Sequence, residues 1–167
     1  MTLPMPADRY QFRPMTAADL PLVKRWLAEP HVVQWWGDTC EQFELVSGDL
    51  EVEAMDQFIV ATDDRPFGYI QCYDPEVWPD NGLGDHPGGT RGIDQFIGEP
   101  AMVDRGHGSA FIRSFIDRLL ASGAPRVITD PDPANGRAIR AYEKAGFVKD
   151  RLVDTPDGEA LLMVRNS

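Results

Sequence analysis

The stretch that decides the fold runs from Gly92 to Phe147 and contains four segments with distinct patterns. In order, they read GIDQFI at 92–97, VDRGHGS at 103–109, TDPDPAN at 129–135 and RAIRAYEKAGF at 137–147. The first is a short apolar run, which predicts a strand that carries one carboxylate, Asp94. The second opens a helix, and the fourth is another helix whose end is marked by the glycine Gly146. We therefore expect a strand that presents a carboxylate, a glycine loop before a helix, and a helix that presents the phenol of Tyr142.

Apolar patterns outside this stretch predict the remaining elements. We expect strands at 10–13, 57–61, 67–73, 126–129, 148–153 and 160–164, and helices at about 19–29 and 40–55. Thr16 and Asp19 form a capping box at the first helix, and Pro30 ends it. The adjacent Trp35 and Trp36 cannot both lie on one face of a regular element, so at least one is expected to line a cleft or cover a helix end.

Residues 74–90 hold four glycines, three prolines and four acidic residues around Trp78, which predicts a long loop. Long ordered loops in compact domains are often functional, although a disordered insertion is the alternative. Strands alternate with helices in the second half of the chain, which indicates parallel pairing there, whereas the hairpins indicate antiparallel pairing elsewhere. The prediction is a mixed α/β (α+β) fold, with one sheet covered by helices on both faces and one domain over residues 1–167.

The net charge of −11 disfavours nucleic acid as a partner and favours a cationic one. A solubility role for the charge is the plainer alternative. The chain has no apolar stretch long enough to span a bilayer, and residues 1–10 lack the pattern of a signal peptide. Cys40 and Cys72 have no metal-ligand spacing and are most simply free thiols, so we expect a cytoplasmic protein without a metal.

Gly106 and Gly108 stand directly before a strongly amphipathic helix. Glycines let the backbone approach a ligand, and the first amides of a helix favour a phosphate group. Arg105, His107 and Arg113 are expected to add local positive charge. An ordinary tight turn is the alternative for an isolated Gly-x-Gly pair.

The glycine loop, followed by Asn135-x-x-Ala138-x-x-x-Tyr142 and the run to Phe147, resembles the GNAT superfamily of acetyl-CoA-dependent N-acetyltransferases. Val103 stands where that family usually has Gln or Arg. A narrower resemblance, to aminoglycoside 6'-N-acetyltransferases, rests on further segments. These are HVVQWWG at 31–37, RGIDQ at 91–95, TDPDP at 129–133 and TPDG at 155–158.

The resemblance implies a largely antiparallel sheet with one splayed parallel pair of strands, at which acetyl-CoA binds. It implies Asp94 as general base and Tyr142 as general acid, with direct attack in a ternary complex and a backbone amide near 96–102 as oxyanion contact. From spacing alone, Asp94 is a carboxylate in an apolar run, and Tyr142 is equally consistent with a core aromatic residue. The implied cofactor-binding residues are Phe96, Ile97, Met102, Val103, Arg105, Gly106, His107, Gly108, Ser109, Asn135, Arg137, Ala138 and Tyr142.

The implied acceptor is a cationic small-molecule amine, most simply the 6'-amine of an aminoglycoside, bound by a monomer or weak dimer. Asp94, Asp130 and Asp157 would pair with its ammonium groups, and Trp35, Trp36 and Trp78 would stack on its sugar rings. The alternatives are an acyltransferase for a hydroxylysine-like siderophore precursor or another small amine, and a coenzyme A- or aminoglycoside-binding protein without turnover.

Overall fold

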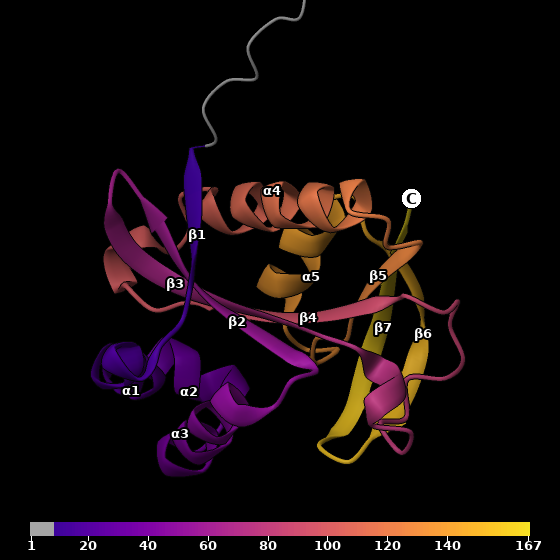
Figure 1. Cartoon of the computed structure of the whole chain (residues 1–167), viewed down its shortest axis with the longest axis horizontal. Coiled ribbons are helices and arrows are strands. Elements are labelled where there is room, and N and C mark those ends of the chain that lie inside the picture. Colours follow the sequence, from indigo (N-terminus) through magenta and orange to yellow (C-terminus); the bar gives the residue numbers. More distant parts are fainter. Residues whose placement is uncertain (1–8) are drawn as a thin grey trace, which may run out of the picture.

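A seven-stranded sheet carries the fold, as the computed structural model shows for residues 9–167 (Figure 1). The strand order is β1-β2-β3-β4-β5-β7-β6. The bounds are β1 Tyr10–Pro14, β2 Met55–Thr62, β3 Arg65–Tyr73, β4 Arg91–Ile97, β5 Arg126–Thr129, β6 Val148–Thr155 and β7 Gly158–Asn166. The predicted strands are confirmed, with ends that move by a few residues because pairing extends them.

Helices cover both faces of the sheet. Figure 1 shows α4 (His107–Ala121) and α5 (Gly136–Lys144) on one side, and α1 (Leu20–Leu27), α2 (Pro30–Trp36) and α3 (Thr39–Gly48) on the other. Each layer has its own apolar core. The first surrounds the aromatic residues and isoleucines of α4, and the second surrounds Val23, Trp26 and Leu27 of α1 and Val32 of α2. The predicted mixed fold is therefore confirmed.

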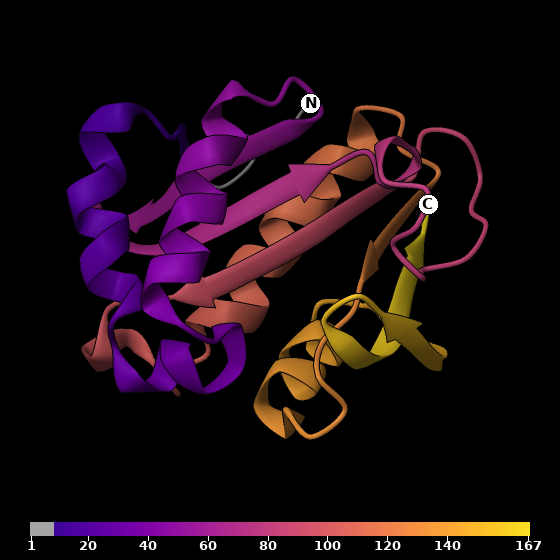
Figure 2. The same ribbon diagram turned by 90° about the horizontal axis from the view of Figure 1, so that it is seen from below.

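The one parallel pair in the sheet, β4 with β5, joins the strands only at Arg91 with Val127 and at Gly92 with Ile128. Beyond these positions the two strands diverge, as Figure 2 shows from below. All other neighbouring strands pair antiparallel. Because β7 inserts between β5 and β6, parallel pairing is limited to this one pair. The outer half of β4, which carries Asp94, thus has a free edge.

Two helix ends follow the sequence signals closely. At Thr16 the backbone amide donates to the Asp19 carboxylate over 2.9 Å, which completes the predicted capping box. At the end of α5, Gly146 has φ +101° and the amide of Phe147 donates to the carbonyl of Tyr142, as in a Schellman cap. Asn135 caps the start of the same helix by accepting from the amide of Ala138. These contacts fix the position of α5 beside the open strand edge.

Two helical segments depart from the sequence prediction. The α-helix expected at 40–55 ends at Gly48, before a 3-10 turn at Asp49–Glu51, and residues 30–36 form a helix that was not expected. Pro30 does end α1, but it also opens α2, because a proline is accepted in the first turn of a helix. The loop 74–90 is ordered, as its composition around Trp78 indicated, with one short 3-10 turn at Pro75–Val77. Its Leu83 is 3% exposed and packs on Ile128 and Leu162, so the loop covers the outer face of β5 and β7. No helix within residues 9–167 is long and apolar enough to cross a membrane.

Phe111→Ala should lower the free energy of unfolding by about 3–5 kcal/mol, because it opens a cavity in the core under α4. Phe111 is 0% exposed and packs against Tyr10 and Phe67. Chemical denaturation measures the loss, with Leu152→Ala on exposed β6 as the control. A loss below about 1 kcal/mol, as expected for the control, would show that this layer is not the main core.

Candidate functional site

Two adjoining cavities open where β4 and β5 diverge. A narrow cavity of about 120 Å³ and a larger cleft of about 640 Å³ share five lining residues, so one leads into the other. The shared residues are Trp35, Trp36, Gln95, Asn135 and Ala138. The narrow cavity is enclosed by α2, the end of β4, the loop before α4, and α5. A reactant in one cavity can therefore meet a reactant in the other along the free edge of β4.

The narrow cavity is lined largely by residues that the sequence assigned to a cofactor. Besides the shared Asn135 and Ala138, these are Phe96, Ile97, Val103, Gly108 and Arg137. His31, which the sequence reading did not include, also lines it and places Nε2 2.8 Å from the carbonyl oxygen of Ile97. Met102, Arg105, Gly106, His107 and Ser109 belong to the adjoining turn, loop and helix start rather than to the cavity wall described.

The loop before α4 is shaped to receive an anion. Gly106 has φ +80° and Asp104 has φ +61°, so the chain turns sharply just before the helix begins. The first amides of a helix have no partner within it, and the helix dipole is positive there. A Cβ at Gly108 would meet only Ile97 Cδ1, at 3.8 Å, so the backbone is open to close approach. These features fit a pyrophosphate.

Gly106→Ala should raise the KM for acetyl-CoA about three- to tenfold, because a side chain costs about 1–2 kcal/mol in the left-handed region. Apart from the glycine and its two chain neighbours, no atom of residues 9–167 lies within 4 Å of the added Cβ, so the expected effect is backbone strain in the loop. Steady-state kinetics with varied acetyl-CoA measures it, and thermal denaturation controls for folding. An unchanged KM would show that the loop does not hold the cofactor.

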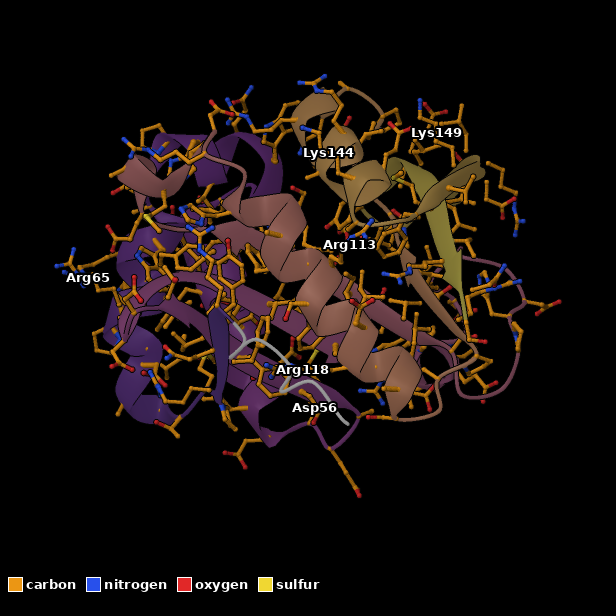
Figure 3. All side chains as sticks on the ribbon, turned by 90° about the horizontal axis from the view of Figure 1, so that it is seen from above. Asp56, Arg65, Arg113, Arg118, Lys144 and Lys149 are labelled. Atoms are coloured by element: carbon orange, nitrogen blue, oxygen red, sulfur yellow. The ribbon has the colours of Figure 1, made fainter. Side chains whose placement is uncertain are left out.

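Contacts of the basic side chains with the rest of the protein reduce the positive charge predicted at this loop. For His107, the prediction that it adds positive charge is wrong. Its ring points into the core, where Nδ1 lies 2.9 Å from the Tyr10 hydroxyl, and burial lowers its pKa. Arg113 points from α4 toward α5 and donates to the carbonyl of Lys144 over 2.8 Å (Figure 3). Arg137 pairs with Asp104 at 3.0 Å. Backbone amides thus remain the main anion donors, together with the exposed Arg105.

The larger cleft is strongly acidic. Eight carboxylates line it, from Asp38, Glu41, Asp49, Asp94, Asp130, Asp132, Asp157 and Glu159. Among residues 9–167, no lysine, arginine or histidine lines it. The charges come from α3, β4, the segment after β5 and the β6–β7 turn, and so surround the space. We name this space the acidic cleft. Its potential favours a ligand with several positive charges.

Asp94 lies on β4 between Ile93 and Gln95 and lines the acidic cleft, and its neighbour Gln95 lines both cavities. Its Oδ2 accepts a hydrogen bond of 2.9 Å from Gln71 Nε2 on the facing strand β3. Burial raises the pKa of Asp94, and the negative charges of Asp157 and Asp49 raise it further, against the Gln71 hydrogen bond. A raised pKa makes a positioned carboxylate a stronger general base than an ordinary one.

Two more acidic residues that the sequence predicted line the same cleft as Asp94. Asp130 follows β5, and burial with the charges of Asp94 and Asp157 raises its pKa to about 8. Asp157 lies exposed in the turn between β6 and β7. Like charges in one cleft repel each other, so binding of a cation relieves the repulsion.

Tyr142 is 4% exposed on α5, and its hydroxyl reaches the acidic cleft. Gln95 Nε2 lies 3.4 Å from this hydroxyl. Burial raises the pKa of Tyr142 to about 12, so the phenol keeps its proton at neutral pH. Its ring packs edge-on against Phe147 at 5.4 Å. The residue is thus both a core aromatic side chain and a proton donor at the cleft.

The structure brings two of the three predicted tryptophans to the site. Trp35 and Trp36 both line the two cavities. Neighbouring residues on a helix point about 100° apart, so the two side chains meet the cavities from different directions. Trp78 packs on Tyr73 at 5.9 Å instead, and within the described chain it lines neither cavity. The prediction that the 74–90 loop carries a ring-stacking tryptophan is therefore not supported by its position.

Two glutamines were missed by the sequence reading. Gln71 contacts Asp94, and Gln95 contacts Tyr142. The register pairs Gln71 directly with Asp94 across β3 and β4. An alignment of the two predicted strands by their apolar pattern would have placed them side by side, since cross-strand neighbours lie on the same face.

Known proteins resemble this chain over nearly its whole length. The model of the acetyltransferase (GNAT) domain family matches residues 15–155. Aminoglycoside N(6')-acetyltransferase type 1 of Klebsiella pneumoniae is 34% identical over 172 residues, covering 95% of this chain and 83% of that protein. A crystal structure of aminoglycoside acetyltransferase AAC(6')-Ib with coenzyme A and kanamycin has a TM-score of 0.78 at 33% identity, with 94% of each chain covered. The ribostamycin and coenzyme A complex of AAC(6')-Ib gives 0.80 at 33%, covering 95% of this chain and 94% of that one.

Proposed function

The chain belongs to the GNAT acetyltransferase family, and from this premise we propose that it transfers acetyl from acetyl-CoA to the 6'-amine of aminoglycosides. The acidic cleft carries the proposal. Eight carboxylates face it without a cationic side chain among the described lining residues, which suits an acceptor with several ammonium groups. A small acceptor with a single amine needs far fewer carboxylates. The relatives named for this activity support the same acceptor class.

The narrow cavity and the loop before α4 fit acetyl-CoA. The amides after Gly106 would hold the pyrophosphate, and Ile97, Val103 and Ala138 would contact the arm that leads to the thioester. Bound acetyl-CoA supplies an acetyl group activated as a thioester. The free edge of β4 offers the amide of Ile97 to the carbonyl oxygen, as an oxyanion contact.

In the proposed mechanism Asp94 takes the proton of the attacking ammonium. The carboxylate accepts a hydrogen bond at Oδ2 from Gln71 and lines the acidic cleft, next to Gln95, which lines both cavities. Tyr142, which also lines the acidic cleft, holds a proton that it can pass to the departing sulfur. Its raised pKa keeps that proton available across the working pH range.

Attack is proposed to be direct, because neither cysteine is placed to form an acyl-enzyme. Cys40 is exposed on α3, and buried Cys72 accepts from Arg91 Nε over 3.1 Å. None of the described residues that line the two cavities is a cysteine. We also propose that the protein is cytoplasmic and that it is a monomer or weak dimer. Analytical ultracentrifugation tests the oligomeric state.

Asp157→Asn should raise the KM for kanamycin about two- to fivefold and leave kcat within twofold. Asp157 is exposed, so its contribution is that of a solvent-screened ion pair. The wild-type KM should rise with added salt, and the variant's KM should rise less steeply. Kinetics at two ionic strengths measures both. A KM that does not respond to charge or salt would contradict cation binding in the acidic cleft.

Thiol release from acetyl-CoA, measured with a panel of acceptors, tests the proposed function. The panel holds kanamycin, tobramycin, an aminoglycoside analogue without the 6'-amine, N6-hydroxylysine and spermidine. We expect turnover only with acceptors that carry the 6'-amine. Turnover with hydroxylysine or spermidine alone would assign another amine acceptor, and tight coenzyme A binding without turnover would indicate a binding protein.

A further inference from the structure

A chain of hydrogen bonds runs from Asp94 into the layer between the sheet and α3. Gln71 Nε2 donates to Asp94 Oδ2 over 2.9 Å, and Gln71 Oε1 accepts from the Tyr69 hydroxyl over 2.7 Å. The Tyr69 hydroxyl in turn accepts from Gln57 Nε2 over 3.0 Å. The same Gln57 Nε2 donates to the carbonyl of Val46 over 2.8 Å. The chain therefore ends on a backbone group of α3.

The backbone carbonyl sets the direction of every bond in this chain. A carbonyl oxygen only accepts, so Gln57 must turn its NH₂ group toward Val46 and Tyr69. Tyr69 then uses its one proton toward Gln71, whose oxygen accepts it. The NH₂ end of Gln71 is left to face Asp94. The orientation of the Gln71 amide thus follows from the position of Val46, and Asp94 receives a donor rather than a second acceptor.

Tyr69 and Gln57 lie behind the cleft rather than in it. Tyr69 is 0% exposed and Gln57 is 7% exposed, and the described lining residues include neither. The Tyr69 ring stacks on Phe96 at 5.3 Å and meets Trp36 edge-on at 6.1 Å. Burial raises the pKa of Tyr69 well above its usual range, so the hydroxyl remains a donor. A rigid, permanently protonated phenol is suited to fixing an amide.

We propose that Tyr69 is a positioning residue for the transfer reaction: anchored by Gln57, it locks the Gln71 amide in the orientation that donates to Asp94. This inference rests on the proposed role of Asp94 as the base. The lock leaves Oδ1 of Asp94 for the ammonium of the acceptor. It also keeps the base ionised in a site that otherwise opposes its charge.

Other groups facing Asp94 do not change when the Tyr69 hydroxyl is removed. The carboxylates are Asp49 at the end of α3, Asp130 after β5 and Asp157 in the β6–β7 turn. The phenols are Tyr73 on β3 and Tyr142 on α5. Without the Tyr69 hydroxyl, the Gln71 amide can turn and bring its oxygen to Asp94. Because that contact disfavours the ionised carboxylate, the pKa of Asp94 rises. As the pH is lowered, Asp94 is then protonated, and lost as a base, at a higher pH than in the wild type.

The test is the pH profile of kcat/KM for kanamycin in Tyr69→Phe, measured by thiol release with saturating acetyl-CoA. We expect the acid limb to move up by about 0.5–1 pH unit, which lowers kcat/KM on that limb about three- to tenfold. Above the limb the variant should approach the wild type. The matched control is Tyr10→Phe, which also removes a buried tyrosine hydroxyl with a hydrogen-bonded partner, His107. Its acid limb should stay in place.

A double-mutant cycle tests whether Tyr69 acts through Gln71. Gln71→Met should itself move the acid limb upward, and adding Tyr69→Phe should move it no further. If Tyr69→Phe does not fold, Gln57→Met takes its place, with an upward shift again expected. An unmoved limb, or a uniform loss at every pH, would overturn the inference. Asp94→Asn separates the two failures, because full activity in that variant would instead remove the proposed base.

Discussion

Asp94→Asn is expected to lower kcat by about 10²–10⁴-fold, the range for loss of a positioned general base. The amide keeps the size of the side chain but cannot take the proton of the attacking ammonium. Asp94 lines the acidic cleft, with its pKa raised by burial and by neighbouring carboxylates. Steady-state thiol release with kanamycin measures the loss. A kcat within threefold of the wild type would remove Asp94 from the chemistry.

Asp157→Asn is the matched control for this result. It removes a negative charge from the same cleft, and the carboxylate that it removes is exposed. The control should change KM rather than kcat, whereas Asp94→Asn should change kcat foremost. Equal effects of the two variants on kcat would mean that Asp94 contributes only charge. Calorimetric binding of coenzyme A, unchanged in both, shows that the cofactor site is intact.

Tyr142→Phe is expected to lower kcat by about 10²-fold, the lower end of the range for proton transfer, because a thiolate is a good leaving group. The substitution keeps the ring, and with it the contact with Phe147. It removes only the hydroxyl that faces the cleft, so the fold should be retained. Rapid-quench measurement of the first turnover separates this loss from slow product release.

The pH profile gives a second view of Tyr142. Because burial raises the pKa of the phenol to about 12, wild-type kcat should show no alkaline loss from this group below about pH 10. A variant with wild-type kcat would assign Tyr142 to packing alone, the alternative that its helical spacing already indicated. Thermal denaturation of both proteins confirms that the comparison is between folded enzymes.

Much of the fold could be predicted from local sequence signals. The strand at 92–97, the helix after the glycine loop and the helix to Gly146 all have strong periodicity or caps, and all three are present. The segment at 31–37 was not assigned to a helix, because its apolar residues fall on more than one face and its proline was read only as an end. It forms α2, in which Tyr69 of β3 and Phe96 of β4 pack against Trp36.

Site residues could be predicted where their own type and motif indicated the role. They were predicted less well where contacts with residues distant in sequence fix the position of the side chain. Asp94, Asp130 and Asp157 meet in the acidic cleft as expected. His107 was expected to add positive charge, but its burial against Tyr10 is a tertiary contact that no local pattern contains. Trp78 lies away from the cavities because Tyr73 offers it a partner. Such outcomes depend on which strands become neighbours.

The position of the acetyl group on kanamycin tests the account most directly. The product of the reaction with ¹³C-acetyl-CoA can be assigned by two-dimensional NMR, in which the labelled carbonyl correlates with the protons next to the acetylated nitrogen. We expect a single product with acetyl on the 6'-amine, formed by wild type and lost in Asp94→Asn. Acetyl on another amine, a mixture of sites, or no acetylated product would contradict it.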